Sequence, residues 1–241
     1  IFNIKNIVVE GNEKIAEKYL EAAVKENQCE DGGNIIIMNP QNGDILAMAT
    51  YPDYNLNEPF VVERTGYTPE DWNQLDSTAK SEAYSLLYQN RAVTGTYEPG
   101  STFKVIMSAI GLEENVVTTD QVGDFNCTGA YQVADRSIAC WASNPHGGLS
   151  LRGALENSYN PAFMQLGQRI NSQIGIDRLY DYFDAFGLFD KVGTSFARAY
   201  SGHFHDKETI GPVELATTSF GENFTISPLQ LLAAISAIAN D

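Results

Sequence analysis

The chain has 241 residues, of which 43% are hydrophobic and 19% are charged, as in a globular protein with a sizeable buried core. Acidic residues outnumber basic residues by 31 to 15, which gives a net charge of −16. This charge repels phosphate groups and argues against nucleic acid or an anionic membrane surface as a direct partner. The sequence has no apolar run of about 18 residues, so no membrane-spanning helix is predicted.

The first predicted elements are a helix and a β-hairpin. Residues 12–27 are apolar at helical spacing, and the side predicted to face the core carries Ile15, Tyr19, Leu20, Ala23 and Val24. Two apolar segments, 35–38 and 44–50, flank an Asn-Gly pair that favours a tight turn between antiparallel strands. Because two strands alone are marginally stable, we expect further strands beside this hairpin.

The rest of the chain is predicted to be mainly helical. Residues 51–75 are rich in Pro, Asn and Tyr and indicate a long loop, whereas residues 120–148 indicate an irregular lobe. The apolar spacing predicts five helices, at residues 77–88, 101–114, 150–170, 176–186 and 227–240. The last begins with a Ser-Pro cap and is apolar on nearly every side, so it is predicted to be buried.

One predicted helix opens with a serine and a lysine three positions apart, in the segment YEPGSTFK at 97–104. Pro99-Gly100 breaks the chain, so Ser101 stands at the positive end of the helix, where developing negative charge is stabilised. Ser101 and Lys104 share one helix face at this spacing. A serine hydroxyl needs a base, and burial in an apolar helix would lower the pKa of Lys104 enough for that role.

A second polar group, Ser158 and Asn160, interrupts the apolar pattern of residues 150–170. A hydroxyl there is suited to relay a proton, and an amide is suited to bind a peptide carbonyl. Each motif is weak by itself, since another Ser-x-x-Lys occurs at Ser77 and Lys80 without the Pro-Gly break. The plainer alternatives are a capped core helix at the first motif and a loop between two helices at the second.

Four blocks of the sequence together resemble the transpeptidase domain of class B penicillin-binding proteins. The blocks are IIIMNPQNGDILAMATYPDYNLN at 35–57, RAVTGTYEPGSTFKVIMSAIGLEE at 91–114, HGGLSLRGALENSYNPAFMQLG at 146–167 and GPVELATTSFGENFTISPLQLLAAISAIAND at 211–241. They stand in the family's order and include two motifs of penicillin-recognising enzymes. The resemblance implies one domain over residues 1–241 with a mixed α and β (α+β) fold, an antiparallel sheet flanked by helices.

The resemblance also implies a function, the cross-linking of peptidoglycan in cell-wall synthesis and cell shape. Ser101 would attack the D-Ala-D-Ala bond of a stem peptide, with Lys104 as general base, Ser158 as proton shuttle and Asn160 as a substrate contact. β-Lactam antibiotics would acylate the same serine, and no cofactor is required. A glycan polymerase is the implied partner, and an anchor absent from this chain would hold the protein at the extracytoplasmic face of the bacterial cell membrane.

The chain departs from the family pattern at two places. It contains no Lys-Thr-Gly or Lys-Ser-Gly triplet, and its one Lys-x-Gly, at 191–193, comes too early and has valine instead of a hydroxyl. We therefore expect the domain to be incomplete at the C-terminus, with the strands around the third motif beyond Asp241. The second departure is GTSFARA at 193–199, where the family usually has a Leu-Pro-Gly-Glu turn.

A cluster of metal-binding residue types lies close to the second motif. The side chains that could bind a metal are those of Cys127, Asp135, Cys140 and His146, and their types suit a closed tetrahedral zinc site. Such a site would order the irregular lobe without taking part in acyl transfer. The alternatives are a Cys127–Cys140 disulfide or two free thiols. The histidine also belongs to the family's second block, which explains it without a metal.

Two other functions stay open at this point. A class D-like β-lactamase or β-lactam sensor shares the Ser-Thr-Phe-Lys motif, although its second motif lacks the asparagine, and rapid turnover of a penicillin would favour it. An inactive, truncated scaffold is the other alternative. A longer chain with the third motif that still failed to acylate would favour that scaffold.

Overall fold

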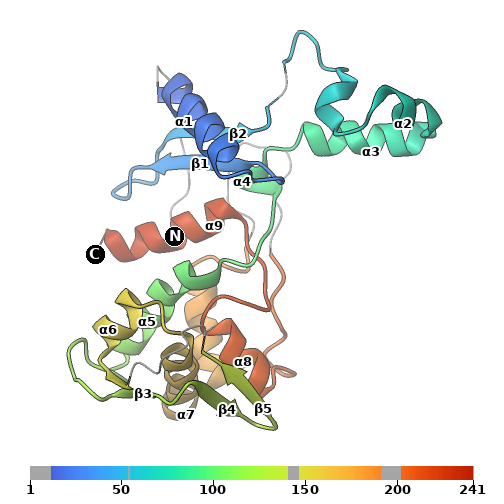
Figure 1. Ribbon diagram of the computed structural model, residues 1–241. Helices are drawn as coiled ribbons and strands as arrows, with labels where there is room; N and C mark the ends of the chain where they lie inside the picture. Colours follow the sequence, from blue (N-terminus) through green and yellow to red (C-terminus); the bar gives the residue numbers. More distant parts are fainter. Residues whose placement is uncertain (1–11, 54, 141–146, 191–201, 241) are drawn as a thin grey trace.

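The computed structural model describes the chain except for residues 1–11, 54, 141–146, 191–201 and 241 (Figure 1). The helices are α1 (Asn12–Glu26), α2 (Pro69–Gln74), α3 (Ser77–Leu87), α4 (Arg91–Thr94), α5 (Lys104–Glu113), α6 (Leu151–Glu156), α7 (Asn160–Ala185), α8 (Pro212–Thr218) and α9 (Pro228–Ala239). Two 3-10 helices are η1 (Val62–Thr65) and η2 (Gly100–Phe103). The strands are β1 (Gly33–Met38), β2 (Ile45–Tyr51), β3 (Phe125–Cys127), β4 (Ala130–Val133), β5 (Arg136–Ala139) and β6 (Gly147–Leu149).

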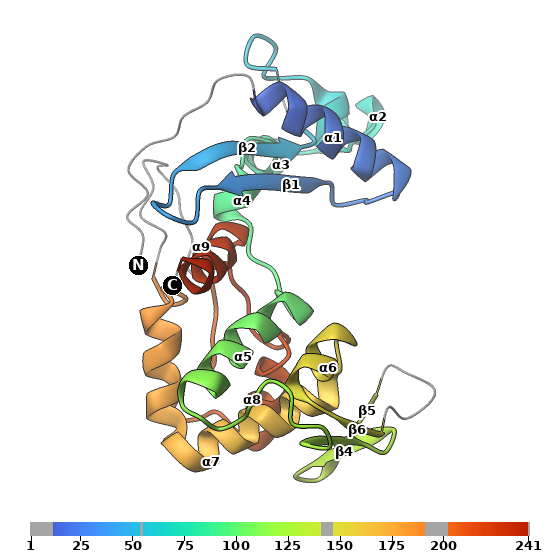
Figure 2. The same ribbon diagram turned by 90° about the vertical axis from the view of Figure 1, so that its left-hand side faces the viewer.

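The predicted hairpin is confirmed as β1 and β2, which pair antiparallel from Gly33 opposite Tyr51 onwards. The predicted turn is present, since Gly43 N–H donates to Asn39 at 2.9 Å, but the connection of residues 39–44 is longer than a tight Asn-Gly turn. It is closed by the backbone of Asn39, whose N–H donates to the carbonyl of Asp44 at 2.8 Å. Helix α1 lies on one side of this two-stranded sheet, and α4 and α9 lie on the other (Figures 1 and 2).

Helix α1 forms as predicted, and Leu20 and Val24 of the predicted face are buried, but the buried stripe is narrower than predicted. Ala16, Leu20 and Val24 are its buried residues, packed on the small side chains of β2, whereas Ile15 is 57% exposed and Tyr19 is 67% exposed. The buried stripe has four-residue spacing and small side chains, which let the helix approach the alanines of β2 closely. Apolar character therefore identified Leu20 and Val24 correctly but not Ile15 and Tyr19.

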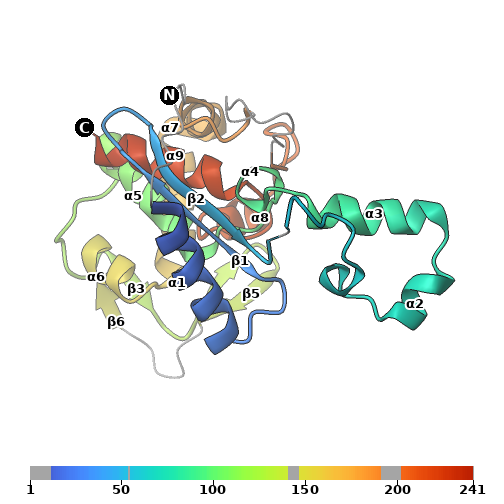
Figure 3. The ribbon, with the colours of Figure 1, turned by 90° about the horizontal axis from the view of Figure 1, so that it is seen from above.

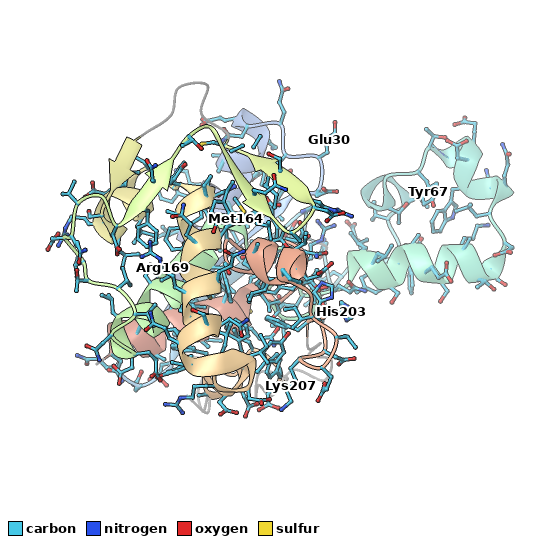
Figure 4. The ribbon with its side chains drawn as sticks, turned by 90° about the horizontal axis from the view of Figure 1, so that it is seen from below. Glu30, Tyr67, Met164, Arg169, His203 and Lys207 are labelled. Carbon is cyan, nitrogen blue, oxygen red and sulfur yellow. The ribbon has the colours of Figure 1, made fainter. Side chains whose placement is uncertain are left out.

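The main core lies below α9, around α5 and α7 (Figure 2). Helix α5 contributes buried Ile106, Met107 and Ile110, and α7 contributes a long buried run that includes Met164. Figure 4 shows Met164 and Arg169 on the same helix. Arg169 forms an ion pair at 2.8 Å that holds the segment before β3 against α7. As predicted, α9 is buried along much of its length, and its serine cap completes a capping box.

Two predicted segments differ from the structure. The helix predicted at 150–170 is two helices, α6 and the start of α7, because Ser158 between them has a left-handed φ of 50°. Helix α7 then continues beyond a break at Gly175, and this second half confirms the helix predicted at 176–186. The loop predicted at 51–75 contains η1 and α2, which together with α3 project away from the body (Figures 1 and 3).

The irregular lobe predicted at 120–148 carries two short antiparallel pairs in its described part, β3 with β6 and β4 with β5. The lobe packs on α7 through β3 and β4. In the part of the chain that the structure describes, no helix has the length and apolar character needed to cross a membrane. The described elements thus give the predicted mixed α and β fold, with helices on both faces of a small antiparallel sheet.

Candidate active site

The Ser101 turn is built by the residues that precede it. Gly100 has φ of 56° in the left-handed region that favours glycine, and it starts η2, which runs directly into α5. Thr102 Oγ1 donates to the carbonyl of Pro99 at 2.6 Å and satisfies one acceptor of the turn. Ser101 is exposed, whereas Phe103 is fully buried and fastens the turn to the core. The Ser101 side chain therefore faces solvent, while its backbone is anchored to the core.

Lys104 lies one turn deeper, with no exposed surface. Its Nζ is 3.0 Å from Ser101 Oγ, 3.0 Å from Ser158 Oγ, 2.8 Å from the Ser158 carbonyl oxygen and 2.6 Å from Asn160 Oδ1. The structure thus brings together the four residues predicted as the site, from η2, α5, the α6–α7 connection and the start of α7. Lys104 is the group that touches the other three.

The connection between α6 and α7 explains how two Ser158 oxygens reach one amine. The Ser158 N–H donates to Leu155 at 3.0 Å, and the Tyr159 N–H donates to Ala154 at 2.8 Å, which ends α6. The left-handed φ of Ser158 then directs its carbonyl and hydroxyl to the same side. Such a conformation is unfavourable for serine, so the surrounding contacts must hold it.

Burial lowers the pKa of Lys104 to about 8, against a smaller opposing effect from the carboxylate of Glu222. The cause is the cost of placing a charged amine away from water. The Phe163 ring, centred 5.4 Å from Nζ, forms part of these surroundings. A lysine with a pKa near neutrality is a competent base, which an exposed lysine is not.

The surroundings of Nζ can serve a neutral amine. Four oxygens lie within 3.0 Å of Nζ, and the amine can bond three of them at once in either charge state. When neutral, it donates two protons and offers its lone pair to the Ser101 hydroxyl. The Ser158 hydroxyl donates to Ser101 Oγ at 2.7 Å, so a continuous path for protons links the two serines and the lysine. This arrangement can activate a serine for nucleophilic attack.

The sequence prediction missed the loop of residues 221–223, which supports the Ser101 turn. Gly100 N–H donates to the carbonyl of Gly221 at 2.8 Å. Gly221 has φ of 90°, and a Cβ there would lie 1.9 Å from the Gly100 oxygen. The one sequence signal was a glycine after Phe220 within the last family-like block, which does not by itself indicate a partner more than a hundred residues away.

The predicted four-residue zinc site has no support in the described residues, which do not include the side chain of Cys127. Asp135 lies in the turn before β5 and Cys140 follows the end of β5, so about 13 Å of strand separates the two. Ligands of one zinc ion must all lie within about 2.3 Å of it. His146 lies outside the described residues, and the described residues hold no group of three or more His, Cys, Asp or Glu side chains suited to a metal.

The other motifs considered in the sequence do not join this site. Ser77 and Lys80 lie on α3 in the projecting segment, where Lys80 Nζ is 5.8 Å from the centre of the Trp72 ring. Figure 1 shows α3 well away from α5. The Lys-x-Gly triplet at 191–193 and the altered turn at 193–199 lie outside the described residues.

The sequence of the chain matches one protein-family model, described as the penicillin binding protein transpeptidase domain, over residues 33–241. Stage V sporulation protein D of Bacillus subtilis is 35% identical over 210 residues, covering 87% of this chain and 29% of that protein. Peptidoglycan D,D-transpeptidase FtsI of Escherichia coli K12 is 27% identical over 238 residues, covering 99% of this chain and 35% of that protein. The chain therefore spans about a third of these relatives' length.

Solved structures show the same fold. A putative peptidoglycan glycosyltransferase from Atopobium parvulum superposes with a TM-score of 0.74 at 28% identity, over 94% of this chain and 47% of that one. Pseudomonas aeruginosa PBP2, solved in complex with WCK 5153, gives a TM-score of 0.70 at 27% identity, over 92% of this chain and 50% of that one. The chain therefore shares the fold of the matched parts of these proteins.

Proposed function

The chain belongs to the transpeptidase family of class B penicillin-binding proteins, and on that premise we propose that it is a peptidoglycan D,D-transpeptidase that works through a Ser101 acyl-enzyme. The observation that carries the proposal is the buried amine of Lys104, which lies within 3.0 Å of both serine hydroxyls. Peptidoglycan is the substrate class that the relatives' names give for those proteins.

In the proposed acylation, Ser101 Oγ attacks the carbonyl carbon between the two D-alanines of a stem peptide. The hydroxyl proton passes to Lys104 Nζ, 3.0 Å away, and the Ser101 N–H serves as an oxyanion donor at the helix start. The C–N bond then breaks, and the proton reaches the leaving D-alanine amine through Ser158, whose Oγ lies 2.7 Å from Ser101 Oγ. An ester on Ser101 and free D-alanine are the products.

In the second half-reaction an amine of a neighbouring stem peptide attacks the ester carbonyl, and its proton returns through the same groups. A new peptide bond forms and Ser101 regains its hydroxyl. Asn160, whose Oδ1 accepts from Lys104 at 2.6 Å, keeps its amide nitrogen available for a substrate carbonyl. No step requires a metal or an organic cofactor. A β-lactam enters the same path at Ser101 and stops at the ester.

The cellular setting is part of the proposal. We infer that the protein acts at the extracytoplasmic face of the bacterial cell membrane, held there by an anchor outside this chain, and that a glycan polymerase is its partner. What supports this is membership of the family, together with a net charge of −16 that opposes direct binding to an anionic surface.

The experiment is intact-protein mass spectrometry after incubation with a penicillin. It uses this chain and the complete product of its gene, because the family's third motif contributes to the same site and is absent from residues 1–241. We expect one adduct with the full mass of the penicillin, since ring opening releases no fragment. Ser101→Ala should remove the adduct, and Ser77→Ala, the matched control on α3, should keep it.

The alternatives predict other results. A β-lactamase would release hydrolysed penicillin within seconds to minutes and leave no lasting adduct. An inactive scaffold would stay unmodified even as the complete gene product. An adduct that persists in Ser101→Ala would show that another residue is acylated and would overturn the assignment. Release of D-alanine from a peptide ending in D-Ala-D-Ala, by the unmodified protein alone, would complete the case.

A further inference from the structure

Two segments far apart in the sequence are joined beside the Ser101 turn. Tyr97 and Ile226 exchange two backbone hydrogen bonds of 3.0 Å, as in an antiparallel bridge. Gly100 N–H donates to Gly221 at 2.8 Å, which extends the pairing in the same antiparallel direction. The segment 97–100, which leads into the nucleophile, is therefore aligned with the segment 221–226.

One side chain on segment 97–100, that of Glu98, also binds the backbone of segment 221–226. The carboxylate oxygen Oε1 of Glu98 accepts a hydrogen bond of 2.8 Å from the backbone N–H of Asn223. Asn223 has a left-handed φ of 67°, two residues after the left-handed Gly221. The left-handed conformation is sparsely populated for asparagine, so surrounding contacts must hold it. Glu98 thus adds a hydrogen bond at the exposed tip of a loop whose Gly221 and Glu222 N–H groups also donate to Thr218 at 3.0 Å and Thr217 at 3.1 Å.

The loop tip carries Glu222 between these two left-handed residues. Burial lowers the pKa of Lys104, and the electrostatic interaction with the Glu222 carboxylate opposes that decrease. The other groups around the Lys104 amine are uncharged: Ser101, Ser158, Asn160 and the Phe163 ring. The remaining titratable groups on the two paired segments are Tyr97 and Glu98, with His203 bridged to Thr225 on the next segment.

We propose that Glu98 is a positioning residue of this site: it holds the 221–223 loop against the Ser101 turn and thereby sets the place of Glu222 relative to Lys104. The inference deepens the proposed function and rests on it for its effect on acylation. The position of Glu222 matters because a carboxylate near the amine favours the charged lysine, which cannot act as a base. The loop therefore sets the pH at which the nucleophile becomes active.

The first test measures the charge of Lys104 directly and does not depend on activity. The ¹³Cε shift of Lys104 is followed by NMR against pH, and its signal is assigned as the one that Lys104→Met removes. Glu222→Gln should move the titration of Lys104 to lower pH, because the stabilising carboxylate charge is gone. Glu98→Ala should move it in the same direction, because the freed loop no longer holds Glu222 in place.

Two further variants separate positioning from a general structural effect. Glu98→Gln keeps an oxygen that accepts from Asn223, so it should restore the titration of the original protein. In the double variant Glu98→Ala with Glu222→Gln, the titration should match that of Glu222→Gln alone. Glu113→Gln, an exposed carboxylate at the far end of α5, is the matched control and should leave Lys104 unchanged.

The second readout is the rate of acylation by a fluorescent penicillin across the same pH range. Glu98→Ala should move the midpoint of the rate against pH to lower pH, in parallel with the NMR titration, so that acylation below that midpoint becomes faster. An unchanged NMR titration in Glu98→Ala, or failure of Glu98→Gln to restore it, would overturn the inference. A correct NMR result with no acylation in the original protein would instead count against the proposed function.

Discussion

The body around Lys104 and the projecting segment of residues 55–88 are both held by aromatic pairs, yet the pairs differ in what they join. In the body, Phe103 packs on Phe183 at 5.7 Å and on Phe224 at 4.7 Å between ring centres, which links three distant parts of the chain. In the projecting segment, Tyr84 packs on Trp72 at 4.9 Å and on Phe60 at 5.4 Å. These partners lie within one short stretch of sequence.

The difference in sequence range is matched by a difference in burial. Phe103 and Phe183 have no exposed surface, whereas Phe60 is 72% exposed. Helix α2 has no buried residue, and Figure 4 shows Tyr67 in this segment, away from the body. Long-range pairs fix the active-site residues to one another, while local pairs stabilise only the segment that makes them. We therefore expect changes in the two regions to differ in both size and reach.

The largest expected effect is on chemistry, from Lys104→Met. The change removes the base but keeps a side chain of similar length in the buried position. Penicillin acylation should fall by about 10²- to 10⁴-fold, the usual worth of a positioned base. In the original protein, the rate should rise with pH through a midpoint near the Lys104 pKa of about 8. A variant that keeps its rate and its pH profile would remove Lys104 from the mechanism.

The same substitution should also change how the stability of the folded chain depends on pH. The pKa of Lys104 is about 8 in the folded chain against an ordinary value of 10.5, so the unfolded chain binds the proton more tightly. The original protein should therefore gain stability relative to Lys104→Met as pH rises from about 8 to 10.5, by roughly 3 kcal/mol in total. Urea unfolding of both proteins at several pH values tests this, and parallel curves would contradict it.

A matched pair of phenylalanines compares the two regions directly. Phe183→Ala should lower the free energy of unfolding by about 3–5 kcal/mol, because it leaves a cavity beside Phe103 in the core. Phe60→Ala should cost no more than about 0.5 kcal/mol, because most of that side chain already faces solvent. Urea unfolding measures both. Equal losses of unfolding free energy would show that the projecting segment and the core unfold as one cooperative unit.

The features that could be predicted from the sequence depend on local contacts, and those that could not depend on long-range contacts. The strands of the hairpin and the Ser227 cap were predicted because short apolar runs around a turn signal and serine capping are local rules. The break at Ser158 was only an alternative in the sequence, because tertiary contacts to Lys104 hold its left-handed backbone. The bond between Glu98 and Asn223 joins residues 125 positions apart, and no local pattern indicates it.

A smaller effect is expected from Trp72→Ala, which removes the ring that packs on both Tyr84 and Tyr67. We expect faster amide hydrogen exchange over residues 60–88, with a change in global unfolding of about 1 kcal/mol or less. Acylation should stay the same, since no described contact joins this ring to the Ser101 site. Hydrogen exchange monitored by mass spectrometry shows both regions at once, and faster exchange around α5 would contradict the separation.

No effect on acylation is expected from Lys80→Met, the counterpart of Lys104→Met at the second Ser-x-x-Lys motif. Lys80 lies over the half-buried Trp72 ring at 5.8 Å, an interaction worth about 0.5–1 kcal/mol. The free energy of unfolding should therefore fall by no more than this, and acylation should not change. The two lysines share a motif and differ in burial, so equal effects of the two substitutions on acylation would mean that burial of the amine is not what makes Lys104 a base.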